Sequence, residues 1–178
     1  MSRDNRFKWP LESNTVPSDL ALFGSIRDGG TKAHHGWDLV ASTGTPCYAT
    51  ADGVVIFNGT LGGYGRTLDI LLNYTIKGDA VILRLAHLEK VVEGIKVGVA
   101  VEQSQHVCYT GNTGVTRGPH LHFEYMKIHR PDGGGIPGLD DRHDPKVIYG
   151  EATPRQTYHE NHKKVGEEKK VGEEHVDQ

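Results

Sequence analysis

Short apolar runs with a period of two constrain the fold of this chain more than any other feature of its sequence. Two of these runs stand on either side of the turn-forming tripeptide Lys77-Gly78-Asp79. Their alternating residues are Leu68, Ile70, Leu72 and Tyr74 before the turn, and Val81, Leu83, Leu85 and His87 after it. Because successive side chains of a strand point to opposite faces, the pattern predicts a β-hairpin whose apolar face ends at His87.

Further short apolar runs precede and follow this hairpin. They lie within residues 37–57, 97–101, 107–109 and 121–128. The 23 glycines follow no collagen-like period, and many of them stand between the runs. Glycines in such places are typical of turns between strands, so the sequence predicts a mostly β fold.

Three parts of the chain differ in character. Residues 1–19 are predicted to form an N-terminal segment that packs on the domain, and residues 20–150 form the domain itself. Residues 151–178 are highly charged, and the segment 163–168 is repeated there as 169–174. Because this last part has few apolar residues, it is predicted to be a solvated or disordered tail, with a short helix or a segment that docks on a protein partner as the alternative.

Charge and hydropathy exclude several classes of partner. A formal charge of −3 and a pI near 6.4 give no electrostatic basis for binding nucleic acid or an anionic membrane. No apolar stretch approaches the roughly 20 residues that span a bilayer. Residues 1–6 lack the apolar core of a signal peptide, so the sequence indicates no export route.

Four of the eleven histidines stand in an arrangement that could build a metal site. On a strand, His120 and His122 would project side by side, while Leu121 and Phe123 face the core. A lone His-x-His pair is more often structural, so this motif decides nothing by itself.

A second motif, which runs from His34 to Asp38, adds a carboxylate. Residues four apart share one face of a strand, so His34 and Asp38 would point the same way, whereas His35 would point away. Gly36 between them would leave that face open. Two imidazoles and one carboxylate on a tetrahedral zinc ion leave a fourth position for water, which is the catalytic pattern.

The two motifs together can supply every role in metal-assisted amide hydrolysis. With His34, Asp38 and His122 as ligands, His87 and His120 remain to orient the water, take its proton and pass it to the leaving amine.

Seven motifs in order along the chain resemble the lysostaphin-type (LytM-like) zinc endopeptidases, which cleave peptidoglycan. They are His34-x-Gly36-x-Asp38, Gly44-Thr45-Pro46, Ala51-Asp52-Gly53-Val54-Val55, Gly62-Gly63-Tyr64-Gly65, Ala86-His87-Leu88, Gly111-x-Thr113-Gly114 and Gly118-Pro119-His120-Leu121-His122-Phe123-Glu124. Three further segments resemble motifs near the ends of the family's domain. They are Trp9-Pro10, Phe23-Gly24 with Arg27, and Asp144-Pro145. The resemblance thus covers about residues 7 to 150.

This resemblance implies a zinc-dependent endopeptidase that hydrolyses peptide cross-links of bacterial peptidoglycan, in the periplasm or outside the cell. It implies one zinc ion on His34, Asp38 and His122, with His87 and His120 as the catalytic histidines. The implied fold is an antiparallel β-sheet core with long loops that form a groove over the metal. Candidates for the groove walls are the loops 23–32, 57–67, 110–118 and 130–143.

Some positions depart from the family pattern. Leu85 stands where many relatives have a Tyr, which removes a phenol that could help to hold a reacting oxyanion. The segment 102–104 replaces a common Gly-Gln. Cys47 and Cys108 replace a common Val and Gly, which leaves two alternatives, a pair of buried thiols or one disulfide between core strands.

Two other functions compete with hydrolysis. Two histidines and a carboxylate also form the facial triad of non-heme iron oxygenases, although that motif usually places its first His and carboxylate two residues apart, not four. The more serious alternative is a catalytically weak relative that binds cell wall or activates another hydrolase, although such relatives typically lack the zinc ligands. The site residues do not distinguish a D-amino-acid cross-link from a glycine bridge, nor a phage lysin from a secreted effector.

Overall fold

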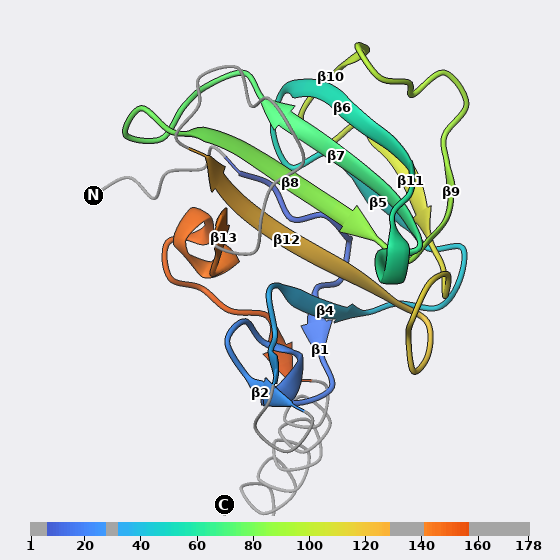
Figure 1. Cartoon of the computed structure of the whole chain (residues 1–178), viewed down its shortest axis with the longest axis vertical. Coiled ribbons are helices and arrows are strands. Elements are labelled where there is room, and N and C mark those ends of the chain that lie inside the picture. Colours follow the sequence, from blue (N-terminus) through green and yellow to red (C-terminus); the bar gives the residue numbers. More distant parts are fainter. Residues whose placement is uncertain (1–6, 28–31, 129–140, 157–178) are drawn as a thin grey trace, which may run out of the picture.

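A seven-stranded antiparallel sheet forms the centre of the computed structural model, which describes residues 7–27, 32–128 and 141–156 (Figure 1). Its strands are β4 (Trp37–Val40), β6 (Gly53–Thr60), β7 (Arg66–Leu72), β8 (Ala80–Ala86), β10 (Ala100–Val101), β12 (His120–Ile128) and β13 (Arg142–His143). They lie in the order β10-β6-β7-β8-β12, and both β4 and β13 pair with the remaining edge of β12. The structure therefore confirms the predicted antiparallel β-sheet core.

Smaller elements surround this sheet. Their bounds are β1 (Thr15–Val16), η1 (Asp19–Ala21), β2 (Ile26–Arg27), β3 (Lys32–Ala33), β5 (Pro46–Tyr48), η3 (Gly62–Tyr64), β9 (Leu88–Val91), β11 (His106–Thr110), η5 (Pro145–Tyr149) and β14 (Arg155–Gln156). β5, β11 and β9 form a three-stranded antiparallel sheet, β2 pairs with β3, and β1 pairs with β14. Within the described parts of the chain, no helix is long and apolar enough to cross a membrane.

β7 and β8 confirm the predicted hairpin. Leu68 lies opposite Leu85 and Ile70 lies opposite Leu83, so the alternating apolar residues share one face. That face packs into the main hydrophobic core. The largest fully buried apolar residues of this core are Trp37, Leu39, Leu68, Ile70, Leu83, Leu85, Leu88, Leu121, Phe123 and Tyr125.

The opposite face of the same sheet carries polar rows instead. Asp38 on β4 is the cross-strand partner of His122 on β12. One row further along, Glu124 on β12 lies opposite Arg84 on β8, and Arg84 lies opposite Asp69 on β7. Because side chains alternate between faces, the residues that fill the core on one side fix these polar rows on the other.

The prediction of a loop that extends to residue 143 is wrong at its end. The sequence predicts a loop over 130–143, but Arg142 and His143 form a strand that pairs with Met126 and Tyr125 of β12. This partner is remote in sequence, so no local pattern could reveal the pairing. Residues 129–140 lie outside the described part of the chain.

The N-terminal segment packs on the domain through aromatic side chains and pairs with residues 155–156. Trp9 stacks on Tyr149 with 4.0 Å between ring centroids and on Trp37 with 5.7 Å. The parallel pairing of β1 with β14 brings Thr15 beside Arg155, within the segment that the sequence assigns to the tail. The rest of that predicted tail, residues 157–178, lies outside the described part of the chain.

The two cysteines lie next to each other across two core strands. Cys47 on β5 and Cys108 on β11 are cross-strand partners, and both side chains are fully buried. Both thiols are free in the structure, and burial raises the pKa of Cys108 well above its usual value. The structure thus corresponds to the buried-thiol alternative, in which both side chains pack in the core as small apolar groups.

Candidate metal centre

His34 is held by the segment that precedes it. Its backbone N–H donates to the carbonyl of Ser25 at 2.9 Å, and its Nδ1 donates to the carbonyl of Leu22 at 3.0 Å. A carbonyl can only accept, so the proton of the neutral ring is on Nδ1 and Nε2 is bare. Nε2 lies 3.1 Å from Oδ1 of Asp38, as the sequence predicts for two residues on one face.

His122 meets the same carboxylate oxygen from the neighbouring strand. Its Nδ1 lies 2.7 Å from Asp38 Oδ1, and its Nε2 lies 2.8 Å from Oε1 of the fully buried Glu124. A donor bond from Nε2 to Glu124 frees Nδ1 to bind a metal, which is the usual arrangement of a metal-binding histidine backed by a carboxylate.

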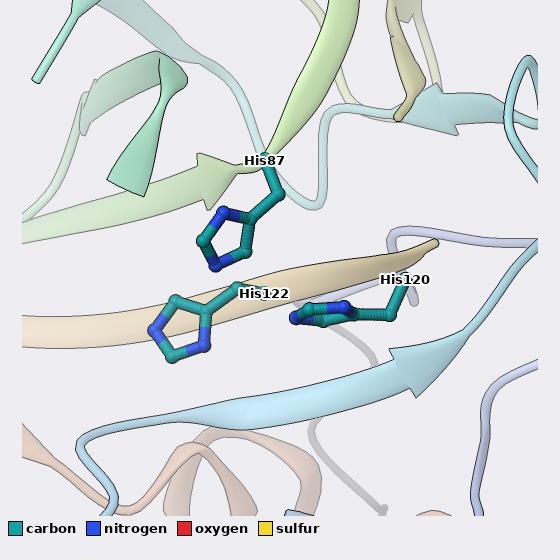
Figure 2. A group of neighbouring side chains, drawn as sticks. All are labelled: His87, His120 and His122. Carbon is teal, nitrogen blue, oxygen red and sulfur yellow. The ribbon is translucent and has the colours of Figure 1, made fainter. Parts of the chain in front are cut away.

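The other two predicted histidines lie beside this pair. His120 precedes His122 on β12, and His87 follows β8; Figure 2 shows the rings of His87, His120 and His122 gathered over β12. Nδ1 of His87 donates to the carbonyl of Thr113, and Nδ1 of His120 donates to the carbonyl of Gly118, both at 2.7 Å. Each of the four imidazoles therefore has one nitrogen anchored to an acceptor and the other available.

Two overlapping sets of residues could bind a metal ion. His34, Asp38 and His122 form one set, and His87, His120 and His122 form the other. In each set the ligand atoms lie within 4.8 Å of one another. The first set contains the only carboxylate among these five residues and so offers an anionic ligand to a divalent cation, whereas the second set offers three imidazoles; zinc accepts both kinds of set.

The electrostatics of the cluster favour a cation. Burial raises the pKa of Asp38, but the contacts of its carboxylate with the rings of His120, His122 and His34 outweigh burial, lower the pKa and keep this carboxyl ionised. Burial lowers the pKa of His122, but hydrogen bonds to Asp38 and Glu124 outweigh it and bring the value to about 9 in the metal-free protein. The site thus already holds a positive charge, carried by a proton that a metal ion can replace.

His87 has a backbone conformation that side chains rarely adopt. Its φ of 58° places it in the left-handed region directly after β8, and its N–H donates to the carbonyl of Tyr64 at 2.8 Å. This turns its ring away from the line of β8 and toward β12 (Figure 2). His87 thus follows the end of the strand, as predicted, but its left-handed backbone directs its ring to His120 and His122 instead of to the apolar face. Burial lowers its pKa despite the bond to Thr113, which favours a neutral imidazole at neutral pH.

A tight contact between two loops holds His87 in place. Gly65 has a φ of 65°, and a Cβ there would collide with the backbone of Thr113 and Gly114. The N–H of Val115 also donates to the carbonyl of Gly63 at 2.8 Å. The turn at η3 and the loop after β11 therefore pack together as one support for the histidine.

Sequence reasoning missed the groups that hold these side chains. Glu124 stands two residues after His122 on the same strand face, which was a usable signal. The Tyr64 hydroxyl lies 2.7 Å from Oε1 of Glu124, and Nε of Arg142 lies 3.0 Å from Oε2. Tyr64 stands in one of the quoted motifs, but nothing in the sequence connects it with Glu124, and Arg142 stands in none of the motifs. Leu85, the departure from the family pattern, is buried in the core and brings no polar group to the site.

Comparison with known proteins shows the family of this chain. The sequence profile described as Peptidase family M23 matches residues 32–133, more than half of the chain. Peptidoglycan DD-endopeptidase ShyA of Vibrio cholerae is 32% identical over 126 residues, which are 70% of this chain and 26% of that protein. ShyC of the same organism is 37% identical over 101 residues, which are 55% of this chain and 21% of that protein. The chain thus matches about a quarter of the length of these relatives.

Solved structures share the fold. The catalytic domain of the antimicrobial peptidase lysostaphin from Staphylococcus simulans superposes with a TM-score of 0.57 at 26% identity, over 82% of this chain and 94% of that one. LytU superposes with a TM-score of 0.58 at 33% identity, over 79% of this chain and 89% of that one. With the matched profile, the antiparallel sheet and the His/Asp cluster in agreement, the chain belongs to peptidase family M23.

Proposed function

We propose that this chain is a zinc-dependent endopeptidase that hydrolyses peptide cross-links of bacterial peptidoglycan. The observation that carries the proposal is the convergence of His34 and His122 on one oxygen of Asp38, at 3.1 and 2.7 Å, with His87 and His120 beside them. Structural zinc sites use all four positions for protein ligands, whereas three ligands leave one position for the reaction.

His34, Asp38 and His122 are the proposed ligands. The donor set fits zinc, because two imidazoles with bare nitrogens and an ionised carboxylate are the ligand types that zinc accepts in catalytic sites. Nε2 of His34 and Nδ1 of His122 are bare when their other nitrogens donate to Leu22 and Glu124. The resemblance to lysostaphin-type endopeptidases supports this set over the three-histidine alternative.

His87 and His120 are the proposed catalytic residues. A bound zinc ion would act as a Lewis acid toward the attacking water and the scissile carbonyl. Both histidines keep Nδ1 on a backbone carbonyl, so each would exchange a proton at Nε2. The lowered pKa of His87 suits a base that takes a proton, and His120, whose Nε2 lies 3.5 Å from Asp38, would return one to the leaving amine.

The proposed substrate is a cross-link that contains a D-amino acid. Relatives that are 32% and 37% identical carry the name peptidoglycan DD-endopeptidase, which favours this bond over a glycine bridge. The protein would act in the periplasm or outside the cell, where this substrate lies. The predicted groove walls at 23–32, 57–67 and 110–118 would select the peptide. The charged segment 151–178 is a proposed site for a protein partner.

Digestion of purified cell wall tests the proposal and names the bond. The zinc-loaded protein is incubated with meso-diaminopimelate peptidoglycan and with glycine-bridged peptidoglycan, and the released fragments are identified by mass. Fragments cut at a D-amino-acid cross-link, absent with His120→Ala, are expected. If neither wall is cut while zinc is bound, the proposal fails in favour of a protein that binds cell wall or activates another hydrolase.

A further inference from the structure

Four buried or half-buried side chains surround the carboxylate of Glu124: Tyr64, Arg84, His122 and Arg142. Its Oε1 accepts from the Tyr64 hydroxyl at 2.7 Å and lies 2.8 Å from His122 Nε2. Its Oε2 accepts from Nε of Arg142 at 3.0 Å and lies 3.7 Å from Nη1 of Arg84. Both oxygens are thus occupied, and the side chain is inaccessible to water.

Arg142 forms the main ion pair with the carboxylate of Glu124. Arg84 is already committed to Asp69, with both oxygens of that carboxylate 2.9 Å from its guanidinium nitrogens. Nε of Arg142 donates to Oε2 of Glu124, and Nη2 of Arg142 donates to the Tyr64 hydroxyl oxygen at 3.2 Å. The planar fork of Arg142 thus holds both Glu124 and the Tyr64 hydroxyl that donates to Glu124, and this fixes the orientation of the carboxylate.

The orientation of Glu124 decides which nitrogen of His122 faces the metal. If Oε1 accepts the Nε2 proton, Nδ1 is bare beside Asp38, and the ring is held at both ends. Among the four histidines of the site, only His122 is anchored by a carboxylate, through Nε2. His34, His87 and His120 are each anchored by a hydrogen bond from Nδ1 to a backbone carbonyl. A carboxylate side chain can rotate about its own bonds, whereas a backbone carbonyl cannot, so the orientation of His122 depends on the groups that hold Glu124.

We propose that Arg142 and Glu124 are positioning residues for the metal ligand His122, and that the short strand β13 is therefore part of the metal centre. Arg142 lies beyond residues 32–133, the segment that matches the family profile. β13 brings it opposite Met126, on the face of β12 that also carries Glu124 and His122. The inference rests on the proposed ligand set, since it concerns how that set is held.

Zinc affinity is the readout that separates positioning from folding. Zinc alone is titrated into the metal-free full chain in competition with a chromogenic chelator, for wild type, Arg142→Met, Glu124→Gln and the double variant. Each single variant is expected to bind zinc about 10- to 100-fold more weakly, as for other groups behind a metal ligand. The double variant is expected to be little weaker than the weaker single variant, because both changes remove the same support.

A matched control comes from the same segment. Lys146→Met also removes a positive charge, but Lys146 is half exposed and pairs only loosely with Glu151, at 3.6 Å. Its zinc affinity is expected to stay within about twofold of wild type. Arg142→Lys keeps the charge without the fork, and it should restore part of the affinity lost in Arg142→Met.

The outcomes separate this inference from the function on which it rests. If wild type binds one zinc ion and loses it in His34→Ala, while Arg142→Met and Glu124→Gln bind as tightly as wild type, the positioning role is refuted and the proposed function stands. If wild type binds no zinc, the proposed function itself fails. Should Arg142→Met not fold, Glu124→Gln, which keeps the shape of the side chain, decides the question alone.

Discussion

Nδ1 of His122 lies 2.7 Å from Oδ1 of Asp38, across the pairing of β12 with β4. The two residues are 84 positions apart in sequence, yet strand register makes them direct partners. A shift of one residue in that register would turn one of the two side chains to the opposite face. The metal centre therefore depends on the same pairing that packs Leu39 and Leu121 into the core.

Metal content should distinguish the two candidate ligand sets. His34→Ala is expected to lose the metal, because Nε2 of His34 supplies one of three donors. His87→Ala is expected to retain one zinc ion per chain, because His87 belongs only to the alternative set. Elemental analysis after dialysis against trace zinc measures both variants. Retention by His34→Ala together with loss by His87→Ala would assign the metal to the three-histidine set.

Catalysis should fail without loss of metal when His87 is replaced by Asn. Asn tolerates the left-handed conformation at this position better than most residues, so the fold should be maintained. Loss of the imidazole should lower kcat by about 100- to 10,000-fold, the usual effect of a removed acid or base. Cleavage rates on a cross-linked muropeptide dimer, with zinc content checked in parallel, measure this. A turnover within a few fold of wild type would exclude His87 as a catalytic residue.

The metal-free protein should become less stable as the pH rises from about 6.5 to 9. The folded protein raises the pKa of His122 from 6.5 to about 9, through its bonds to Asp38 and Glu124. The stabilisation is therefore complete below pH 6.5 and is lost as the pH rises through 9, by an amount on the order of 3 kcal/mol. Urea unfolding in chelator at several pH values measures the free energy of unfolding. His122→Asn is the control. If the free energy of unfolding of this variant falls with pH as steeply as that of wild type, another group causes the effect.

Gly36→Ala should destabilise the protein at the edge of the metal centre. A Cβ at this position would collide with the carbonyl oxygen of Phe123 and would lie 2.9 Å from Cγ of Glu124. The segment at Gly36 would have to move away from β12, which would lower the free energy of unfolding by about 1–3 kcal/mol. Gly118→Ala is the control, since a Cβ there meets nothing within 4 Å. Equal stability of the two variants in urea would contradict the close approach of Gly36 to β12.

The sequence predicts the sheet and the composition of the cluster because both follow from local periodicity. The alternation from Leu68 to Leu85 reveals the hairpin, and the i, i+2 relation of His120 and His122 places them on one face. The spacing of His34 and Asp38 predicts that they point the same way, although only Asp38 lies on β4 and His34 stands in the segment before it. The motifs that resemble a known family then connect segments that periodicity alone leaves separate.

What the sequence does not predict depends on contacts between remote segments or on unusual backbone. β13 becomes a strand only through its pairing with Tyr125 and Met126. His87 departs from its strand because its φ is positive, which an alternating pattern cannot signal. The roles of Tyr64 and Arg142 arise from three-dimensional packing around Glu124, and neither stands at a diagnostic spacing from it.

Removal and return of zinc tests most directly whether this protein is a metallopeptidase. A purified cross-linked muropeptide dimer is incubated with untreated protein, with protein stripped by a chelator and dialysed, and with stripped protein that has received one equivalent of zinc. Cleavage is expected in the first sample, absent in the second and restored in the third, with His122→Ala inactive throughout. Full cleavage by stripped protein, with zinc shown to be absent, would contradict a metal-dependent mechanism at His34, Asp38 and His122.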